Sequence, residues 1–405
     1  MRLLAPAVVL ALLAMPAGAA AQGRAATPPA PSVSSAAAAI LIDARDGAVI
    51  LQKDPDERRA VASTTKLMTA LLVLEGARPG EVFTAPQYNA LAAESKINLR
   101  AGERMRVDDL LEALLLESAN DAAVTLAEGV SGSREAFVAA MNARARKLGL
   151  RDTSYANPIG LDDPQNYSTA HDLARLARVL MRKPRFARTV DMPQAVLESG
   201  SRRRIVDNRN DLVGQYDFVD GIKTGHTLSA GYLLIGAAHA ANGGRVITVV
   251  MGESGEAARD ADTIALMRWG LGRFRQARAL DARRTVARVA VKHSDTPAAL
   301  RPREPLTLTL RSGQRLERKI SVPSEIEGPM PAGRRVGFVA VVRDGQVVRR
   351  VPLVTARAVA GPGALTRAFD SIGLPLLVLL ALGTLIAVVL AAQRLRGRLR
   401  LVRER

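Results

Sequence analysis

The sequence predicts an α/β domain, with an antiparallel sheet flanked by helices, followed by a small all-β sandwich and a C-terminal transmembrane helix. Three observations carry this prediction. Short apolar strand patterns occur at both ends of residues 38–275, with helical patterns between them. Residues 280–360 alternate apolar and polar side chains in short runs, and residues 372–392 contain no charged side chain. The first domain is therefore expected to have one sheet that joins both ends of its sequence.

The elements of the first domain follow from the spacing of apolar residues. A β-hairpin is expected at the start, where two apolar runs flank Asp46-Gly47. Three- and four-residue spacing then predicts helices at about 64–75, 107–127 with a break at 118–120, 134–147 and 170–181. The period changes to strands at 231–238 and 245–251, which are joined by Asn242-Gly243-Gly244, and a last helix is expected at about 258–274.

The two ends of the chain predict export and anchoring. Residues 1–21 combine Arg2, an apolar run and a small-residue cleavage site, as in a secretory signal peptide, and residues 22–37 suit a flexible lead-in. The uncharged segment 372–392 is long enough to cross a bilayer, and the Arg-rich tail 393–405 is expected to stay cytoplasmic. These features predict a protein of the inner membrane whose first domain, residues 38–275, faces the periplasm.

Composition limits the partners and cofactors. The formal charge of +18 could indicate a nucleic-acid binder, but aromatic residues make up only 3% and no RNA-binding or zinc pattern occurs. We therefore expect no nucleic acid, and instead attraction of the basic surface to anionic lipid or wall polymer. The chain has no cysteine and its four histidines are scattered, so neither a metal site nor another cofactor is expected.

The first reactive pattern is Ser63-Thr64-Thr65-Lys66, at the start of a predicted helix. Three-residue spacing places Ser63 and Lys66 on one helix face. A lysine in a partly desolvated pocket can lose its proton and activate the serine as a nucleophile. The pattern alone is weak, because a capping serine followed by a surface lysine would look the same.

Two further patterns follow. Ser118-Ala119-Asn120 interrupts a helical stretch, and it could either cap a helix or supply a second hydroxyl and an amide for a substrate. Lys223-Thr224-Gly225 precedes a predicted strand. It could be a turn with a solvated lysine, or Gly225 could admit substrate to a strand edge where Lys223 and Thr224 bind an anionic group.

Together the three patterns are far more specific than any one of them. Their order along the chain is that of the penicilloyl-serine transferases, and two of only eight lysines occupy the expected places. The sequence resembles the low-molecular-mass penicillin-binding proteins, and specifically the serine-type D-alanyl-D-alanine carboxypeptidases. The likeness covers roughly residues 38–275 and includes the contexts around 157–161, 167–170 and 220–227. It implies a β-lactamase/transpeptidase-like fold.

The resemblance also implies the chemistry and the partners. Ser63 would attack the carbonyl of the D-Ala-D-Ala bond in a peptidoglycan stem peptide, with Lys66 as general base. Ser118 and Lys223 would assist proton transfer to the departing D-Ala, and water would release the shortened stem. β-Lactam antibiotics would acylate Ser63 by the same path and inhibit the enzyme.

Binding roles are carried over in the same way. Asn120 would orient the stem peptide, and the backbone N–H groups of Ser63 and His226 would form the oxyanion hole. Thr224, next to Gly225, would bind the terminal carboxylate, with Arg259 as its more loosely matched partner. Relatives often end in an amphipathic helix, whereas the segment 372–392 is expected to span the membrane.

Three rival readings remain. A class A-like β-lactamase shares the patterns, but its deacylating glutamate is missing, because no Glu occurs between Glu135 and Glu198. A D,D-endopeptidase that cuts cross-links would use the same acyl-serine, and an inactive peptidoglycan-binding scaffold could keep the fold. The sequence leaves open the choice between carboxypeptidase and endopeptidase, the signal cleavage site, the oligomeric state, and the partner of the β domain and the Arg-rich tail.

Overall fold

The structure, a computed structural model, describes residues 28–363, 376 and 378–394. It divides into two compact units. The larger contains the described residues up to Gln276 together with Thr309–Ser312, and the smaller contains Ala277–Leu308 and the described residues from Gly313 onward. The predicted signal peptide 1–21, residues 22–27 of the lead-in and residues 395–405 of the tail lie outside the described residues.

A five-stranded antiparallel sheet forms the centre of the larger unit. Its strand order is β2-β1-β11-β10-β9, with bounds Ala38–Asp43 (β1), Val49–Lys53 (β2), Val219–Thr227 (β9), Gly231–His239 (β10) and Arg245–Glu253 (β11). Strand β1 pairs with β2 on one side and with β11 on the other, where Ile40 lies opposite Val249. The prediction that one sheet joins the two ends of this region is therefore confirmed.

Both faces of this sheet are buried, as the residues of β1 show. All six of its residues are buried, and successive side chains of a strand point to opposite faces. Ile40 and Ile42 belong to the apolar core on one face, whereas Leu41 belongs to the core on the other. Helices must therefore cover both faces.

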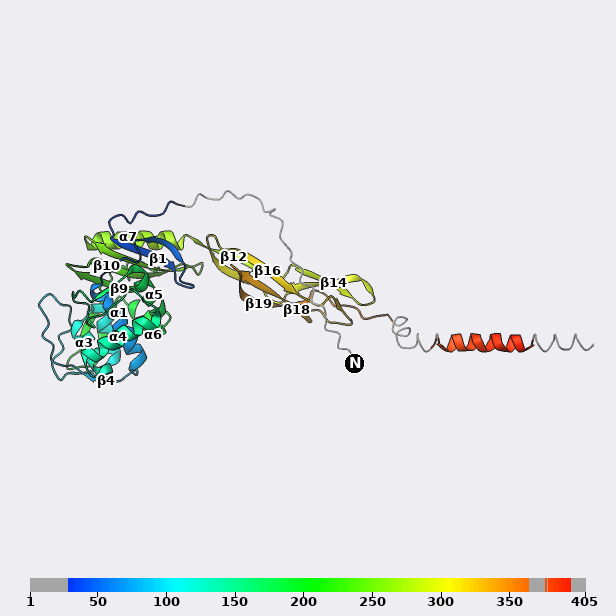
Figure 1. Cartoon of the computed structure of the whole chain (residues 1–405), viewed down its shortest axis with the longest axis horizontal. Coiled ribbons are helices and arrows are strands. Elements are labelled where there is room, and N and C mark those ends of the chain that lie inside the picture. The colour runs from blue at the N-terminus through cyan, green and yellow to red at the C-terminus, as the bar shows by residue number, and fades with distance from the viewer. Residues whose placement is uncertain (1–27, 364–375, 377, 395–405) are drawn as a thin grey trace, which may run out of the picture. The chain divides into compact units, whose positions relative to one another are not determined.

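Helix α7 (Glu256–Leu271) covers one face, and the remaining helices gather on the other (Figure 1). Leu266 and Met267 of α7 are fully buried in the core that contains Leu41. The helices of the other side are α1 (Lys66–Gly76), α2 (Val107–Glu112), α3 (Asn120–Ser131), α4 (Arg134–Leu148), α5 (Ala170–Leu180) and α6 (Pro184–Val190). All of them except α6 were predicted from apolar spacing.

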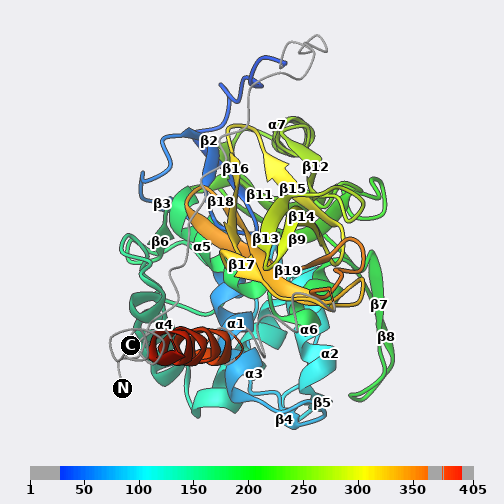
Figure 2. The ribbon, with the colours of Figure 1, turned by 90° about the vertical axis from the view of Figure 1, so that its right-hand side faces the viewer.

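Three two-stranded ribbons complete the larger unit. They pair β3 (Arg59–Ala60) with β6 (Tyr167–Ser168), β4 (Val82–Thr84) with β5 (Arg104–Arg106), and β7 (Gln194–Leu197) with β8 (Arg204–Asp207). Figure 2 shows the β4–β5 and β7–β8 ribbons at the edge of the helical layer, near α2. The sequence analysis predicted none of these ribbons.

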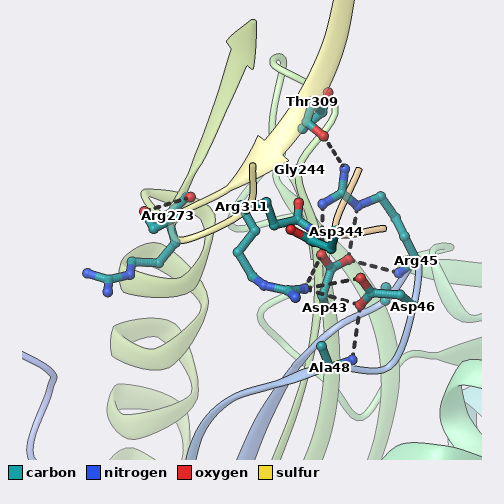
Figure 3. A network of polar contacts seen from close by, with 12 residues as sticks. Asp43, Arg45, Asp46, Ala48, Gly244, Arg273, Thr309, Arg311 and Asp344 are labelled. Carbon is teal, nitrogen blue, oxygen red and sulfur yellow. Dashed lines mark hydrogen bonds and ion pairs between the residues drawn. The ribbon is translucent and has the colours of Figure 1, made fainter. Parts of the chain in front are cut away.

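One buried carboxylate at the end of β1 is surrounded by arginines (Figure 3). Asp43 is fully buried and accepts two hydrogen bonds from the guanidinium of Arg45, at 2.7 and 3.0 Å, and a third from Arg311 at 2.6 Å. Arg311 also reaches Asp46 at 3.1 Å. We call these four residues the Asp43 cluster; in it each buried or half-buried charge faces an opposite charge.

In the smaller unit, the described residues that precede the helix at 378–394 form strands and no helix. Its main sheet has the order β16-β18-β19-β14-β13-β17, with bounds Ala287–Val291 (β13), Ser294–Pro302 (β14), Leu316–Ser321 (β16), Glu325–Ile326 (β17), Arg335–Arg343 (β18) and Gln346–Thr355 (β19). A separate two-stranded sheet pairs β12 (Phe274–Leu280) with β15 (Leu306–Arg311). Opposed apolar pairs such as Val339 and Val351 build the core of the six-stranded sheet.

The predicted transmembrane helix at 372–392 is wrong. Among the described residues, none of the helices combines the length and the apolar character that a membrane crossing requires. The expectations that depended on this span, an inner-membrane anchor and contact with membrane lipids, lose that basis.

Candidate active site

The predicted nucleophile lies in a tight turn at the start of α1. Ser63 belongs to a 3-10 turn (Ala62–Thr65) that leads directly into the helix. Ala62, just before it, has a φ of +45°, in the left-handed region that a residue with a Cβ seldom occupies. Such strain persists only where the surroundings hold it, and it is common at active sites.

Lys66 is fully buried beneath this turn. Its Nζ lies 2.9 Å from the Ser63 Oγ and donates a hydrogen bond to the Ile159 carbonyl oxygen at 2.6 Å. No carboxylate of the described residues forms an ion pair with it. Burial lowers the pKa of Lys66 well below its ordinary value, and the charge of Lys223 lowers it further, whereas Glu94 opposes the shift. A neutral amine beside the hydroxyl can accept its proton.

Ser118 and Asn120 occupy a break between two helical segments. A π-helical turn (Ala113–Glu117) ends at Ser118, which has a φ of +64°, and α3 begins at Asn120. The Ser118 Oγ is buried and has no hydrogen-bond partner among the described residues. An unpaired buried hydroxyl is costly and needs an explanation. A role for this hydroxyl in handling substrate would supply one.

Lys223, Thr224 and Gly225 lie within strand β9, at the edge of the sheet, rather than in a turn before a strand. A Cβ added to Gly225 would stand 3.3 Å from the Ala62 Cβ and 3.4 Å from the Ser63 backbone nitrogen. Gly225 therefore lets the edge strand approach the nucleophile turn closely. This contact joins the first and third sequence patterns in space.

Lys223 is the second buried lysine of the site, with 1% of its surface exposed. Burial, reinforced by the charges of Arg209 and Arg259, lowers its pKa to about 7, while Glu117 opposes the shift. Since Glu117 precedes Ser118 directly, this interaction links the second pattern to the third electrostatically. Arg259 itself is buried in α7 and is bonded to Asp260 at 2.9 Å.

Two of the predicted binding residues differ in exposure. Thr224 is buried to 8% exposure, whereas His226, two residues along the same strand, is exposed. The His226 ring stacks on Tyr232, with ring centroids 4.0 Å apart. Strand β9 thus places the Thr224 hydroxyl inside the site and the His226 ring, stacked on Tyr232, at its exposed edge.

Sequence reasoning missed Glu94. Its carboxylate accepts a hydrogen bond from the Asn120 side-chain amide at 2.7 Å and another from the Tyr88 hydroxyl. It also acts electrostatically on Lys66. Glu94 therefore connects the second pattern to the first. No spacing rule could have found it, because its loop lies far from both patterns in the sequence.

Gly160 lies in the segment 157–161, which supported the family resemblance without being assigned a role. In the structure it packs against the nucleophile turn. A Cβ at this position would lie 2.0 Å from the Ala62 carbonyl oxygen, and its φ of +92° favours glycine. The turn is fixed by the Asn157 side chain, whose oxygen accepts bonds from the backbone N–H groups of Ile159 and Gly160. This is the same turn that presents the Ile159 carbonyl to Lys66.

The fold and the site together define a class of enzyme. A serine at a helix start, a buried lysine beside it, a second buried hydroxyl and an edge strand closing over them are suited to transferring an acyl group through a serine ester. Comparison with known proteins narrows this class.

The family model described as D-alanyl-D-alanine carboxypeptidase, peptidase family S11, matches residues 24–255. The D-alanyl-D-alanine carboxypeptidase DacF of Bacillus subtilis is 31% identical over 82% of this chain and 87% of its own length. DacA of Escherichia coli is 31% identical over 79% of this chain and 82% of its own length. The crystal structure of penicillin binding protein 6B from Escherichia coli, 27% identical, covers 82% of this chain and 98% of that one with a TM-score of 0.60.

The chain belongs to the S11 family of serine-type D-alanyl-D-alanine carboxypeptidases, which are low-molecular-mass penicillin-binding proteins. The family prediction made from the three motifs is confirmed.

Proposed function

We propose that Ser63 is the nucleophile that cleaves the terminal D-Ala from a peptidoglycan stem peptide, and that Lys66 is its general base. The Ser63 Oγ attacks the carbonyl carbon between the two D-Ala residues and its proton passes to the Lys66 amine. The tetrahedral intermediate then loses D-Ala, and the shortened stem remains as an ester on Ser63. Water hydrolyses this ester and regenerates the serine hydroxyl.

The single observation that carries the proposal is the position of Lys66. An amine that is fully buried, 2.9 Å from a serine hydroxyl and without a carboxylate partner among the described residues is suited to cycling between neutral and charged forms. A lysine held in an ion pair would stay charged and could not accept the proton.

The other residues have supporting roles in the same proposal. The buried, unpartnered hydroxyl of Ser118 would relay a proton to the departing amine, assisted by Lys223. Asn120, whose amide group donates to Glu94, keeps its side-chain oxygen for a backbone N–H of the stem. Thr224, with the charge of Arg259 nearby, would bind the terminal carboxylate, and the N–H groups of Ser63 and His226 would bind the oxyanion.

We also place the reaction outside the cytoplasm. The substrate is a cell-wall peptide, and residues 1–21 have the pattern of a secretory signal. β-Lactams would acylate Ser63 because their strained amide presents the same carbonyl to the same nucleophile.

The test is an intact-mass time course of the purified protein with penicillin, next to an assay of D-Ala release from a stem pentapeptide. We expect a persistent penicillin adduct and released D-Ala. The Ser63→Ala variant should show neither, whereas Thr84→Ser, a change in the distant strand β4, should retain both. Cleavage of a cross-linked dimer but not of the pentapeptide would reject the carboxypeptidase assignment. Rapid penicillin hydrolysis without an adduct would point to a β-lactamase.

A further inference from the structure

A cavity of about 230 Å³ opens at the end of the central sheet, formed by residues distinct from those of the catalytic site. The ends of β1, β10 and β11 form one side of it, and the last turn of α5 with the residues that follow forms the other. Its charged lining consists of Arg45, Arg178, Arg182, Arg245 and Asp220. Nothing in the proposed carboxypeptidase reaction uses these residues.

The four arginines of this cavity fall into two kinds. Arg45 is neutralised, because it belongs to the Asp43 cluster, where its guanidinium binds the buried carboxylate of Asp43 (Figure 3). Arg178, Arg182 and Arg245 form no ion pair with any carboxylate of the described residues. The acid of the cavity, Asp220, is already bonded to His239 at 2.7 Å. The cavity therefore carries positive charge that the described protein groups do not balance.

Arg178 and Arg182 are held in place by backbone carbonyls. Arg178 donates from Nε to the Ala44 carbonyl oxygen at 3.2 Å and from Nη2 to the Arg45 carbonyl oxygen at 3.3 Å, and Arg182 donates to the latter oxygen at 3.2 Å. A guanidinium has five N–H donors in a fixed plane. These bonds use only some of them, so both side chains are oriented and still have donors to offer.

Of these three arginines, Arg178 is the half-buried one, and its charge is in an unfavourable position. Burial lowers the pKa of Arg178 and the charge of Arg182 lowers it further, whereas Asp46 and Asp43 oppose the shift. Like charges gathered in a partly desolvated space repel one another. An anion bound between them would remove this repulsion.

We propose that this cavity binds a phosphate group, carried either by free phosphate or by a phosphodiester. Guanidinium groups bind phosphate oxygens through paired, charge-assisted hydrogen bonds. Three unpaired arginines offer more donors than the two oxygens of a carboxylate can accept, whereas a tetrahedral phosphate has oxygens on all sides. Met181 and Ala237 add an apolar wall on which the carbon portion of a phosphate ester can rest.

Binding can be measured on the full chain by isothermal titration calorimetry at constant ionic strength. The probes are inorganic phosphate and glycerophosphoglycerol, which is a lipid headgroup without its acyl chains. We expect saturable binding of at least one probe. The double variant Arg182→Gln/Arg245→Gln, in which both side chains are exposed, should weaken it at least about tenfold. Arg178→Gln should weaken it by a similar factor.

Two comparison variants make the result specific. Arg104→Gln removes an exposed arginine from strand β5, at a different part of the unit, and should change the affinity less than about twofold. Lys223→Met removes a cation of the catalytic site and should also leave phosphate binding unchanged. A melting temperature equal to that of the wild type shows that each variant is folded.

The outcomes separate the possibilities. Tighter binding of glycerophosphoglycerol identifies a phosphodiester as the ligand, and tighter binding of inorganic phosphate identifies free phosphate. Equal weakening in Arg104→Gln would mean that only net charge matters and would overturn the proposal. Loss of binding in Lys223→Met, with none in the arginine variants, would assign the phosphate to the catalytic site and overturn it as well.

Discussion

The Asp43 cluster and the catalytic site both bury charged side chains in the same unit, but they treat them in opposite ways. In the Asp43 cluster a fully buried carboxylate is bonded to two guanidinium groups at 2.6 to 3.0 Å. In the catalytic site two lysines, Lys66 and Lys223, are almost completely buried, and neither forms an ion pair with a carboxylate of the described residues.

This difference decides which charges can react. The charged groups of the Asp43 cluster are bonded to one another, so they contribute to the structure and take no part in the proposed reaction. The unpaired lysines have lowered pKa values because burial disfavours their charged forms. Burial of the two unpaired lysines therefore lowers the stability of the folded chain, whereas at the Asp43 cluster it is the loss of an ion-pair partner that would lower it.

The largest effect is expected from Lys66→Met. Loss of the general base should lower the rate of Ser63 acylation by about three orders of magnitude. The free energy of unfolding should stay equal or rise, because an unpaired buried amine is replaced by an apolar side chain of similar size. Acylation by penicillin and urea unfolding measure the two quantities, and Lys147→Met, on the exposed face of α4, is the matched control. A large loss of stability together with a normal acylation rate would show that Lys66 has a structural role and is not the general base.

The opposite result is expected from Asp43→Asn. The change leaves Arg45 and Arg311 without their buried carboxylate and should lower the free energy of unfolding by about 3 kcal/mol. The acylation rate of the folded protein should stay unchanged. Asp46→Asn, at the exposed side of the same cluster, should cost less than about 1 kcal/mol. Equal losses of unfolding free energy in the two variants would show that the burial of Asp43 does not increase the contribution of its ion pairs to stability.

The pH dependence of stability should reveal the lowered pKa of Lys223. Its pKa is about 7 in the folded chain against an ordinary value of 10.5, so between these values the unfolded chain binds a proton that the folded chain does not. Stability should therefore rise with pH across this window, by up to about 1.4 kcal/mol per pH unit for this group, and level off below pH 7. Urea unfolding from pH 7.5 to 9.5 should show a smaller slope in Lys223→Met. Identical slopes would contradict the lowered pKa.

The smallest effect is expected from Glu94→Gln. The glutamine oxygen can still accept the Asn120 amide, so kcat/KM should fall by only about threefold to tenfold. The variant also removes a negative charge that favours protonated Lys66. The acid limb of the pH–rate profile should consequently move to lower pH. Glu135→Gln, a change at an exposed position of α4, should leave the acid limb where it is. An unshifted acid limb in Glu94→Gln would show that Glu94 does not influence the pKa of Lys66.

The sequence predicted much of this because the relevant signals are local. Three-residue spacing joins Ser63 to Lys66, and short apolar runs mark the strands that become β1, β10 and β11. Glu94 and the Ile159 carbonyl could not be found this way, because each reaches the site through tertiary contacts. The membrane span predicted at 372–392 rested on apolar composition alone, and none of the described helices meets the requirements for crossing a membrane.

The pairing of β1 with β11 has a consequence for the order of events during synthesis. Ser63 and Lys66 emerge early, but the strand that neighbours β1 in the sheet ends at Glu253, and Gly225 and Lys223 also arrive late. Until those residues have been made, β1 has no partner on that side, and the nucleophile turn lacks the strand that packs beside it. The catalytic site therefore cannot be complete before the end of the domain has been made, so an unfinished chain carries Ser63 without the strand that packs beside it.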